Sequence, residues 1–422
     1  MTRSPTSLPP ATVAGRATPA EAGLDADVAV VGAGAAGLYL AARMAQDGLR
    51  VVVLEARDAP TDHSRAIGIH PPGLAALDDI GAAAPLLERG VHVRRGHAFA
   101  GDALHGVRRL GTLDFSRTLR GPWPFVLTVP QHVTEAVLEE RLSVLAPGAL
   151  RRASRVVSWR DDGPAVTVEV LEAQGASAHG RPLRLRVGLL VACVGARGEA
   201  AGPMGVRVDG RSYGDVYLMA DLPESGALAA GTAFRDVGPD EAAIHLANDG
   251  VVEAFPLPGG GRRWVAKTAT LVDPADPAAL SARVAERTGV RLDPASATMV
   301  SAFGVQRRLA RRLATGRVWL CGDAAHVVAP IGGQGMTLAW LGGRSLADAW
   351  SAHLAGRASL SAAAARYDAE QRARARRATA RAAWNLRMGR ASRFGAPRAW
   401  LVRALLAPPL AGRMARLFTM QA

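Results

Sequence analysis

Two glycine-rich segments, near opposite ends of the chain, have residue types and spacings that suit a ligand held by the backbone. In residues 27–57, Gly32, Gly34 and Gly37 stand between an apolar run and a helical pattern. Gly32 allows a tight turn, Gly34 lets a pyrophosphate approach N–H groups at the helix N-terminus, and Gly37 lets the helix pack on the strand. A second apolar run ends in Glu55, whose carboxylate can accept hydrogen bonds from both hydroxyls of a ribose. This order of strand, GxGxxG turn, helix, strand and acid predicts a dinucleotide site.

We call the second segment, residues 322–337 with the sequence GDAAHVVAPIGGQGMT, the glycine loop. It follows the apolar run RVWLC, contains one acid, Asp323, and leads into a helical pattern. A loop with so few side chains usually lets a ligand come close to the backbone. The loop is therefore a second candidate for ligand contact.

The elements that must position these segments change in type along the chain. Residues 73–81 have a helical pattern, and another helix is expected to begin at Gln131. Residues 91–125 and 206–305 mostly alternate like antiparallel strands, and helices are expected again from 338 to about 390. The pattern predicts an α/β fold with a mostly antiparallel block inserted into it.

The composition is that of a globular protein with an excess of positive charge. The chain has 422 residues, 49% of them hydrophobic, and a formal net charge of +14. It contains no uncharged apolar run of about 18 residues, so we expect no membrane-spanning helix. No zinc finger or RNA-binding aromatic signature accompanies the arginines, and nucleic-acid binding is disfavoured. The only cysteines, Cys193 and Cys321, indicate a reducing, cytoplasmic setting without a disulfide framework or metal site.

Four stretches together resemble the flavin-dependent aromatic hydroxylases of the p-hydroxybenzoate hydroxylase type, which are single-component FAD monooxygenases. The stretches are VVGAGAAGL, SRAIGIHPPGLAALDDIG, VPQHVTEAVL and GRVWLCGDAAHVVAPIGGQGM. The resemblance covers about residues 26–390. It implies a Rossmann-like FAD-binding domain with an inserted, mostly antiparallel substrate domain and a helical C-terminus.

The resemblance also implies where the domains lie. It divides the chain into a disordered leader at 1–25, a discontinuous FAD-binding domain at 26–90, 126–205 and 306–365, a substrate domain at 91–125 and 206–305, and C-terminal helices at 366–422. The tail from about 391 is amphipathic. A helix packed on the FAD-binding domain is favoured there over a helix on a membrane surface.

The resemblance assigns most of the site to FAD. The expected FAD-binding residues are Gly32, Gly34, Ala35, Ala36, Gly37, Glu55, Ala56, Arg57, Arg65, Gln131, Gly322, Asp323, Pro330, Gly333, Gly335, Met336 and Thr337. Asp323 would bond the ribityl chain or diphosphate, and Pro330 and Gly333 would lie along the isoalloxazine. His326 would be structural. No side chain is a certain catalyst, because the reactive C4a-hydroperoxide forms on the flavin after reduction by NAD(P)H.

Substrate is expected between the antiparallel sheet and the glycine loop. The candidate lining residues are Tyr213, Tyr217, His245, Phe255 and Trp264. Strand alternation lets only about half of them face the loop, and core packing explains each of them equally well.

The sequence departs from the family at four positions. Val194 and Gly198 replace an acid and a serine of a segment that helps to organise the FAD and NADPH sites. Thr337 stands where asparagine is frequent, although its backbone and hydroxyl can still bond there. Gly342 stands where aspartate is common.

Three functions are compatible with these features. The first is an FAD-dependent monooxygenase that uses NAD(P)H and O2 to hydroxylate or epoxidise a hydrophobic aromatic or polyketide-like molecule. The second, suggested by the segment ACVGARG, is an FAD-scaffold enzyme with non-oxygenating chemistry, such as a cyclase or prenyl-chain reductase. The third is a non-catalytic flavin-binding protein. The sequence does not indicate the oligomeric state.

Overall fold

The computed structural model describes most of the chain. The described ranges are 23–61, 66–104, 106–173, 180–196, 204–223, 233–392 and 395–421. Of the expected site residues, Arg65 lies outside them, as does Gly198. Most of the expected leader lies outside them too.

The first sheet is built around the strand that precedes the GxGxxG turn. Its order is β17 (Ala314–Thr315), β18 (Val318–Leu320), β11 (Arg181–Ala192), β1 (Ala26–Val31), β2 (Val51–Leu54) and β8 (Leu150–Arg151), while β10 (Val166–Glu172) and β9 (Ser154–Asp161) extend from β11. From β18 to β8 neighbouring strands are parallel, with Val30 opposite both Val53 and Val191. The central strands β1 and β2 are valine-rich apolar runs, as is typical of parallel strands that are covered on both faces.

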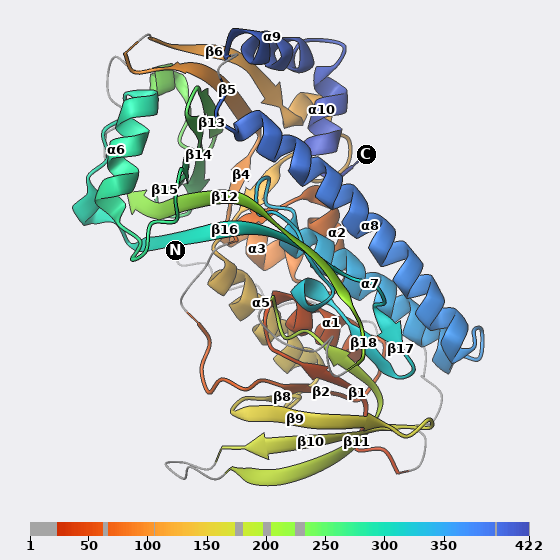
Figure 1. Cartoon of the computed structure of the whole chain (residues 1–422). Helices are drawn as coiled ribbons and strands as arrows, with labels where there is room; N and C mark the ends of the chain where they lie inside the picture. The colour runs from red at the N-terminus through yellow and green to blue at the C-terminus, as the bar shows by residue number, and fades with distance from the viewer. Residues whose placement is uncertain are drawn as a thin grey trace, which may run out of the picture.

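The second sheet is mostly antiparallel. Its order is β19 (His326–Val327), β16 (Met299–Ala310), β12 (Val208–Pro223), β15 (Gly261–Thr268), β14 (Gly250–Leu257), β13 (Ala242–Ala247), β5 (Arg95–Asp102) and β6 (Gly106–Asp114). Among the described strands of this sheet, only β13 and β5 run parallel. In Figure 1 this sheet lies above the first one, and the long strands β12 and β16 cross between them. β16 spans the expected domain boundary at residue 306.

A small third sheet and the helices connect the two larger sheets. The third sheet has the order β3 (Gly68–Ile69), β7 (Val126–Thr128) and β4 (Val91–Val93). The helices are α1 (Ala35–Gln46), α2 (Pro71–Asp79), α3 (Ala83–Arg89), α4 (Phe115–Thr118), α5 (Gln131–Leu145), α6 (Pro277–Thr288), α7 (Gly335–Leu354), α8 (Leu360–Gly389), α9 (Gly395–Leu406) and α10 (Ala411–Phe418). The predicted mixed α/β fold with a helical C-terminus is confirmed.

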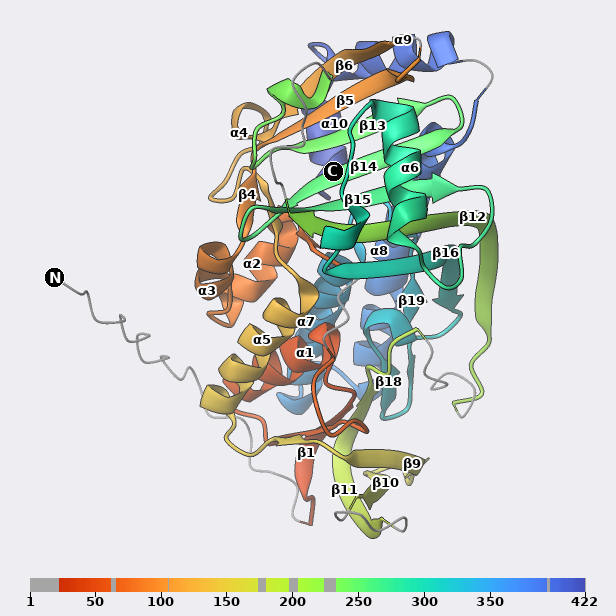
Figure 2. The same ribbon diagram turned by 90° about the vertical axis from the view of Figure 1, so that its left-hand side faces the viewer.

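Helices cover both of the larger sheets. α1 packs against α5 and α7, and their apolar faces form the main core with the first sheet. α6 covers one face of the second sheet, as Figure 2 shows from the side. It begins at Asp276, whose carboxylate accepts hydrogen bonds from the first N–H groups, and ends at Gly289 in the left-handed conformation. The other face of that sheet packs against α8 and the glycine loop.

α9 and α10 pack mainly on the second sheet, and the expected contact with the FAD-binding domain is found only at the end of the chain. There Phe418 meets His70 edge-on with 6.2 Å between ring centroids, and Met420 packs near Leu338 of α7. Leu406 of α9 contacts Gly111 of β6, and Phe418 of α10 stacks on Phe115 of α4 with 6.1 Å between ring centroids. The buried guanidinium of Arg398 donates to the carbonyl oxygen of Ala247 at the end of β13, at 2.7 Å. The sequence pattern identified an amphipathic tail, but the surface that it covers depends on the assembled sheet.

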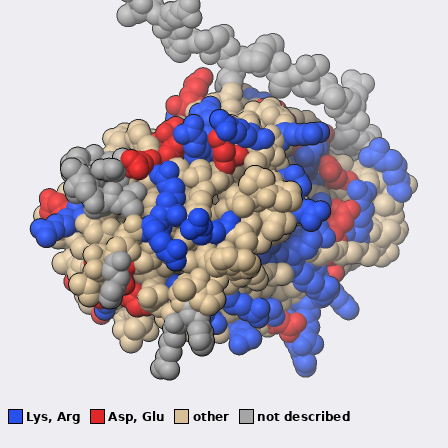
Figure 3. All heavy atoms as spheres, turned by 90° about the horizontal axis from the view of Figure 1, so that it is seen from above, with Lys and Arg blue, Asp and Glu red and all other residues tan. Residues whose placement is uncertain are grey.

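Two surface properties agree with the composition. None of the described helices is long and apolar enough to cross a membrane. On the face shown in Figure 3, basic side chains are more prominent than acidic ones.

Candidate functional site

The GxGxxG turn joins β1 to the start of α1. Gly32 has φ +103°, and a Cβ there would lie 2.6 Å from the carbonyl oxygen of Cys193. A Cβ on Gly37 would collide with the carbonyl oxygen of Gly32. At Gly34, by contrast, the nearest atom to an added Cβ is the Glu135 Oε1, 3.8 Å away. Gly32 and Gly37 are thus required by the turn itself, whereas Gly34 leaves space beside the helix N-terminus.

Glu55 stands at the end of β2 and is bonded to this turn. Its Oε2 accepts the Ala33 N–H at 2.8 Å, and its Oε1 accepts Nε of Arg57 at 2.9 Å. Burial alone would raise the pKa of Glu55, but the hydrogen bonds from Arg57 and from the Ala33 backbone lower it to about 2. Glu55 is therefore an ionised acceptor beside the turn. Its neighbours Ala56 and Arg57 are exposed.

Two polar residues of α5 reach the same place. Gln131 donates from Nε2 to Oε1 of Glu135 at 2.8 Å, and its own Oε1 accepts the Ala66 N–H at 3.4 Å. The same Glu135 oxygen accepts the Ala35 N–H at the N-terminus of α1, at 3.2 Å. Gln131 was expected in the site, but Glu135 was not. Its spacing of one helical turn from Gln131 is the signal that could have indicated it.

Val194 follows β11 and lies beside the GxGxxG turn. A Cβ on Gly32 would approach the Val194 N to 3.4 Å. Val194 is half-buried and packs against the main core. The position where the family has an acid is therefore occupied by an apolar side chain, next to the expected diphosphate site.

The glycine loop begins against α1. Gly322 has φ +66°, and an added Cβ would lie 2.7 Å from Cβ of Ala36. The next residue, Asp323, is exposed. Nearby protein atoms remove part of the water from its carboxylate and raise the pKa of Asp323 to about 6. No donor from the described residues bonds the Asp323 carboxylate.

The middle of the glycine loop forms a tight turn. Gly333 donates its N–H to the carbonyl oxygen of Pro330 at 2.9 Å, and Gly332 and Gly333 are both left-handed, with φ of +89° and +64°. The buried imidazole of His70 donates from Nε2 to the Gly332 carbonyl oxygen at 2.7 Å. Burial lowers the pKa of His70 to about 4 and keeps the ring neutral. Pro330 is exposed, and an added Cβ at Gly335 would meet no atom within 4 Å.

The two departures on α7 have structural explanations. The Thr337 hydroxyl accepts the His70 N–H at 3.2 Å, which joins the start of α7 to α2. Gly342 leaves room for the side chain of Gln371, which donates to Nε2 of His326 at 2.7 Å. His326 is buried, in agreement with a structural role. Met336 is buried in the main core.

One face of the second sheet packs against the glycine loop. Ala329 and Ile331 of the loop share an apolar cluster with Tyr217 and Val265. Tyr213 packs at the edge of this cluster.

Glu253 lies on the same face of the sheet. It pairs with Val265 on one side and with Ile244 on the other. It is buried, which raises its pKa to about 7, and it has no hydrogen-bond partner from the described residues. The hydroxyl of Tyr217 is also buried without a partner from those residues. Two unpaired polar groups on an otherwise apolar face suit a ligand with a polar substituent. The sequence interpretation missed Glu253.

Two of the expected substrate residues point away from the glycine loop. His245 and Trp264 lie on the opposite face, where Trp264 belongs to the cluster under α6 and His245 bonds the Gly101 carbonyl oxygen at 2.9 Å. The expectation that they line a pocket over the glycine loop is wrong, because strand alternation turns them away from it. Phe255 lies on the same face as Glu253, near Phe115 and Phe418.

FAD fits the residues that are present. The GxGxxG turn leaves space at Gly34, and the glycine loop leaves space at Gly335. Asp323, near the start of the glycine loop, offers an acceptor without a donor from the described residues, suited to a ribityl hydroxyl. Across the described part of the chain, no group of His, Cys, Asp and Glu residues could hold a metal ion.

Comparisons with known proteins agree with this geometry. The family model described as FAD binding domain matches residues 25–382. A rifampicin monooxygenase from Streptomyces venezuelae is 33% identical over 318 residues, which are 74% of this chain and 61% of that enzyme. The chain therefore spans less than two thirds of that relative's length.

Solved structures share the fold over nearly the whole chain. A p-nitrophenol 4-monooxygenase from Pseudomonas putida has a TM-score of 0.81 at 22% identity and covers 94% of this chain and 98% of its own. A Diels-Alderase from pyrroindomycin biosynthesis has a TM-score of 0.72 at 25% identity, with coverages of 93% and 80%. The first of these likenesses concerns the fold alone. Because the family model matches most of the sequence, the chain belongs to the FAD-binding domain family.

Proposed function

We propose that the protein is an FAD-dependent monooxygenase that uses NAD(P)H and O2 to hydroxylate or epoxidise a hydrophobic aromatic or polyketide-like molecule. The observation that carries this proposal is the position of the glycine loop. Gly322 packs on α1 beside the GxGxxG turn, while Ala329 and Ile331 pack on the second sheet. A cofactor along this loop would lie next to a largely apolar face.

Different residues would bind the different parts of FAD. Gly34 and the N-terminus of α1 would hold the FAD diphosphate, Glu55 the adenosine ribose and Asp323 the ribityl chain. Pro330, Gly333 and Gly335 would lie along the ring. Bound FAD would supply the redox and oxygen chemistry.

The second sheet would hold the substrate. Its apolar face would exclude water, with Tyr213, Tyr217 and Phe255 as candidate contacts. Glu253, with its raised pKa, could accept the proton of a phenolic hydroxyl. The proposed substrate class is guided by relatives that are named for their substrates, rifampicin and anhydrotetracycline.

The proposal is tested with purified protein reconstituted with FAD. NAD(P)H oxidation and oxygen uptake are followed together while aromatic and polyketide substrates are added in turn. We expect a yellow protein in which one class of substrate stimulates both rates. Bound FAD without substrate-stimulated oxygen uptake would contradict a monooxygenase, and a protein that gains no flavin would exclude FAD chemistry altogether.

A second candidate is an FAD-scaffold enzyme that does not activate oxygen. Val194 beside the GxGxxG turn favours it, because the family's acid at this position helps to organise the FAD and NADPH sites. The Diels-Alderase with the same fold is a precedent for such chemistry. Conversion of a substrate by the FAD-loaded protein without oxygen or NAD(P)H would identify this function.

A further inference from the structure

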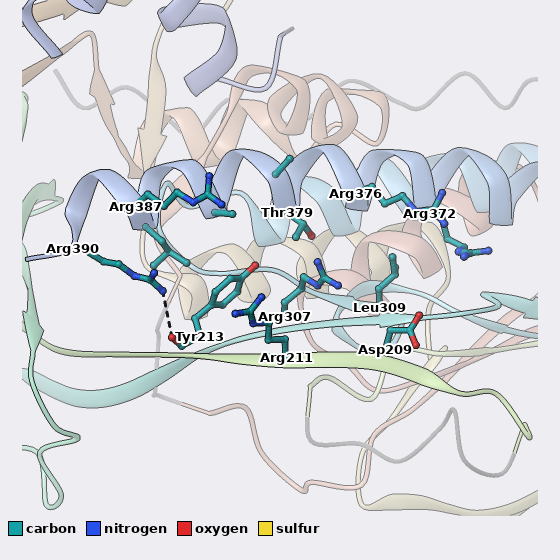
Figure 4. A pocket seen from close by; sticks show the side chains of 13 residues that line it. Asp209, Arg211, Tyr213, Arg307, Leu309, Arg372, Arg376, Thr379, Arg387 and Arg390 are labelled. Carbon is teal, nitrogen blue, oxygen red and sulfur yellow. Dashed lines mark hydrogen bonds between the residues drawn. The ribbon is translucent and has the colours of Figure 1, made fainter. Parts of the chain in front are cut away.

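A groove lined by six arginines runs between α8 and the paired strands β12 and β16. Its volume is about 480 Å³. The arginines are Arg211 on β12, Arg307 on β16, and Arg372, Arg376, Arg387 and Arg390 on or directly after α8. We call it the arginine groove. Figure 4 shows the side chains from the strands and from the helix facing the same space.

The sheet register concentrates positive charge in the arginine groove. Arg211 and Arg307 stand directly opposite each other on neighbouring antiparallel strands. Like charges in this position destabilise a sheet unless something lies between them to compensate. Folding alone therefore gives no reason for this pair.

The helix completes the groove with arginines at both ends and small residues between them. Arg372 and Arg376 are one turn apart, Arg387 and Arg390 follow further along, and Thr379, Ala380 and Ala383 line the middle. The small side chains leave the volume open, while the arginines surround it. A volume of this size is typical of a small-molecule site.

Few carboxylates neutralise these arginines. Arg390 pairs with Asp215 at 2.6 Å, and Arg372 pairs with Asp368 at 3.3 Å. Among the described residues that line the groove, Asp209 is the one acid, and it pairs with Arg311, outside the groove, at 2.8 Å.

The other four arginines have no partner from the described residues. They are Arg211, Arg307, Arg376 and Arg387. The Nε atoms of Arg307 and Arg372 are buried without a hydrogen-bond acceptor from those residues. Buried donors of charged groups are costly when unpaired, so the groove is built to receive an anion.

The arginine groove lies next to the glycine loop. Leu386, which lines the groove, belongs to the same cluster as Ala329 and Ile331 of the loop. On an adjacent face of α8, Arg381 donates to Oε1 of Gln334 at 3.2 Å. One helix thus borders both the expected ring of FAD and the groove.

We propose that the arginine groove binds the phosphate groups of the nicotinamide dinucleotide that reduces FAD. Planar guanidinium groups bind phosphate oxygens in pairs, and several arginines around one volume match a diphosphate better than a single carboxylate. The phenol ring of Tyr213 at the groove offers a surface for the adenine base. The inference rests on the proposed use of NAD(P)H.

The test measures binding directly, without turnover. Isothermal titration calorimetry of the FAD-loaded protein uses ADP, 2′,5′-ADP and inorganic pyrophosphate as probes. The variants are Arg376→Gln and Arg387→Gln, both exposed and without a partner from the described residues. The matched control is Arg377→Gln, which removes the same charge from α8 but does not line the groove.

We expect each groove variant to raise the dissociation constant of an ADP probe about 10-fold or more, and the control to leave it nearly unchanged. The KM for NAD(P)H should rise with it, while FAD content stays that of the wild type. Equal dissociation constants of the ADP probes in the wild type and both groove variants would overturn the inference. So would binding of pyrophosphate without binding of either ADP probe, which would assign the groove to another phosphate ligand. ADP binding decides the inference even if oxygenation itself is never observed.

Discussion

Two carboxylates, Asp323 and Glu253, occupy positions that are unfavourable for folding and suit a role in ligand binding. Loss of surrounding water raises the pKa of Asp323 to about 6 and that of the buried Glu253 to about 7, and neither carboxylate has a hydrogen-bond partner from the described residues. A chain selected for stability alone would pair or replace them. Asp323 was predictable because it belongs to a motif. Glu253 was not, because in the run VVEAFPL it is one polar residue of an ordinary strand, and only the strand pairing shows which face it occupies.

Asp323 should contribute to FAD binding and oppose stability. We expect Asp323→Ala to raise the dissociation constant of FAD by roughly 10-fold or more, through loss of a charged acceptor. The same substitution should make the apoprotein more stable at neutral pH. The pKa of Asp323 is raised from 3.8 to about 6. The contribution of this carboxyl group to the free energy of unfolding is therefore fully present below pH 3.8 and is lost as the pH rises through 6. The variant should lack this loss.

The two effects are measured by flavin fluorescence titration and by chemical unfolding of the apoprotein between pH 4 and pH 8. Asp323→Asn is the conservative control, with an amide oxygen that still accepts. Unchanged FAD affinity in Asp323→Ala would remove this residue from the site.

Glu253 should affect both the pH profile and stability. Its pKa is raised from 4.5 to about 7, so its contribution to stability is present below pH 4.5 and lost as pH rises through 7. At pH 8 we expect Glu253→Gln to raise the free energy of unfolding by roughly 1–3 kcal/mol, and to have little effect near pH 4. If Glu253 accepts a substrate proton, the variant should also lose the kcat inflection near pH 7.

The control is Glu286→Gln on α6, an exposed acid on the other side of the same sheet. This substitution should change neither the free energy of unfolding nor the pH profile of kcat. A stability gain without any change in the kcat profile would make Glu253 a buried acid with no part in proton transfer.

At the scale of elements, the turns could be predicted and the sheet faces could not. The GxGxxG turn and the glycine loop carry their geometry in residue type, because only glycine tolerates the contacts at Gly32 and Gly37 or the conformation of Gly333. Alternation in β13 and β15 shows that half of the residues face one way. It does not show which half, and only the assembled structure shows that His245 and Trp264 face away from the glycine loop.

The glycines of these two elements should divide into those required for folding and those required for the ligand. Gly37→Ala should destabilise the protein by several kcal/mol, because its Cβ would collide with the Gly32 carbonyl oxygen. Gly335→Leu should leave the melting temperature nearly unchanged, because no protein atom lies within 4 Å of an added Cβ. It should nevertheless abolish FAD binding.

Thermal unfolding of the apoprotein and flavin titration distinguish the two classes. If Gly335→Leu binds FAD as well as the wild type, the ring of the cofactor does not lie along this part of the glycine loop.

At the scale of the whole molecule, the site lies where two sheets of different construction meet. The first sheet supplies the GxGxxG turn, the second supplies an apolar face with Glu253, and the glycine loop contacts both. The mixed α/β fold and the nucleotide motif could be predicted from local patterns. The arginine groove could not, because Arg211 and Arg387 come together only through the packing of α8 on β12. The packing position of α9 and α10 could not be predicted either, because these helices contact β5, β6 and α4, which are distant in sequence.

We expect FAD at this junction to transfer one oxygen atom of O2 to a substrate on the second sheet. Turnover of the FAD-loaded protein under isotopically labelled oxygen gas, with NAD(P)H and a converted substrate, tests this by mass spectrometry of the product. A monooxygenase would place one labelled oxygen atom in each product molecule. A converted product that carries no label, formed equally well without oxygen, would contradict it.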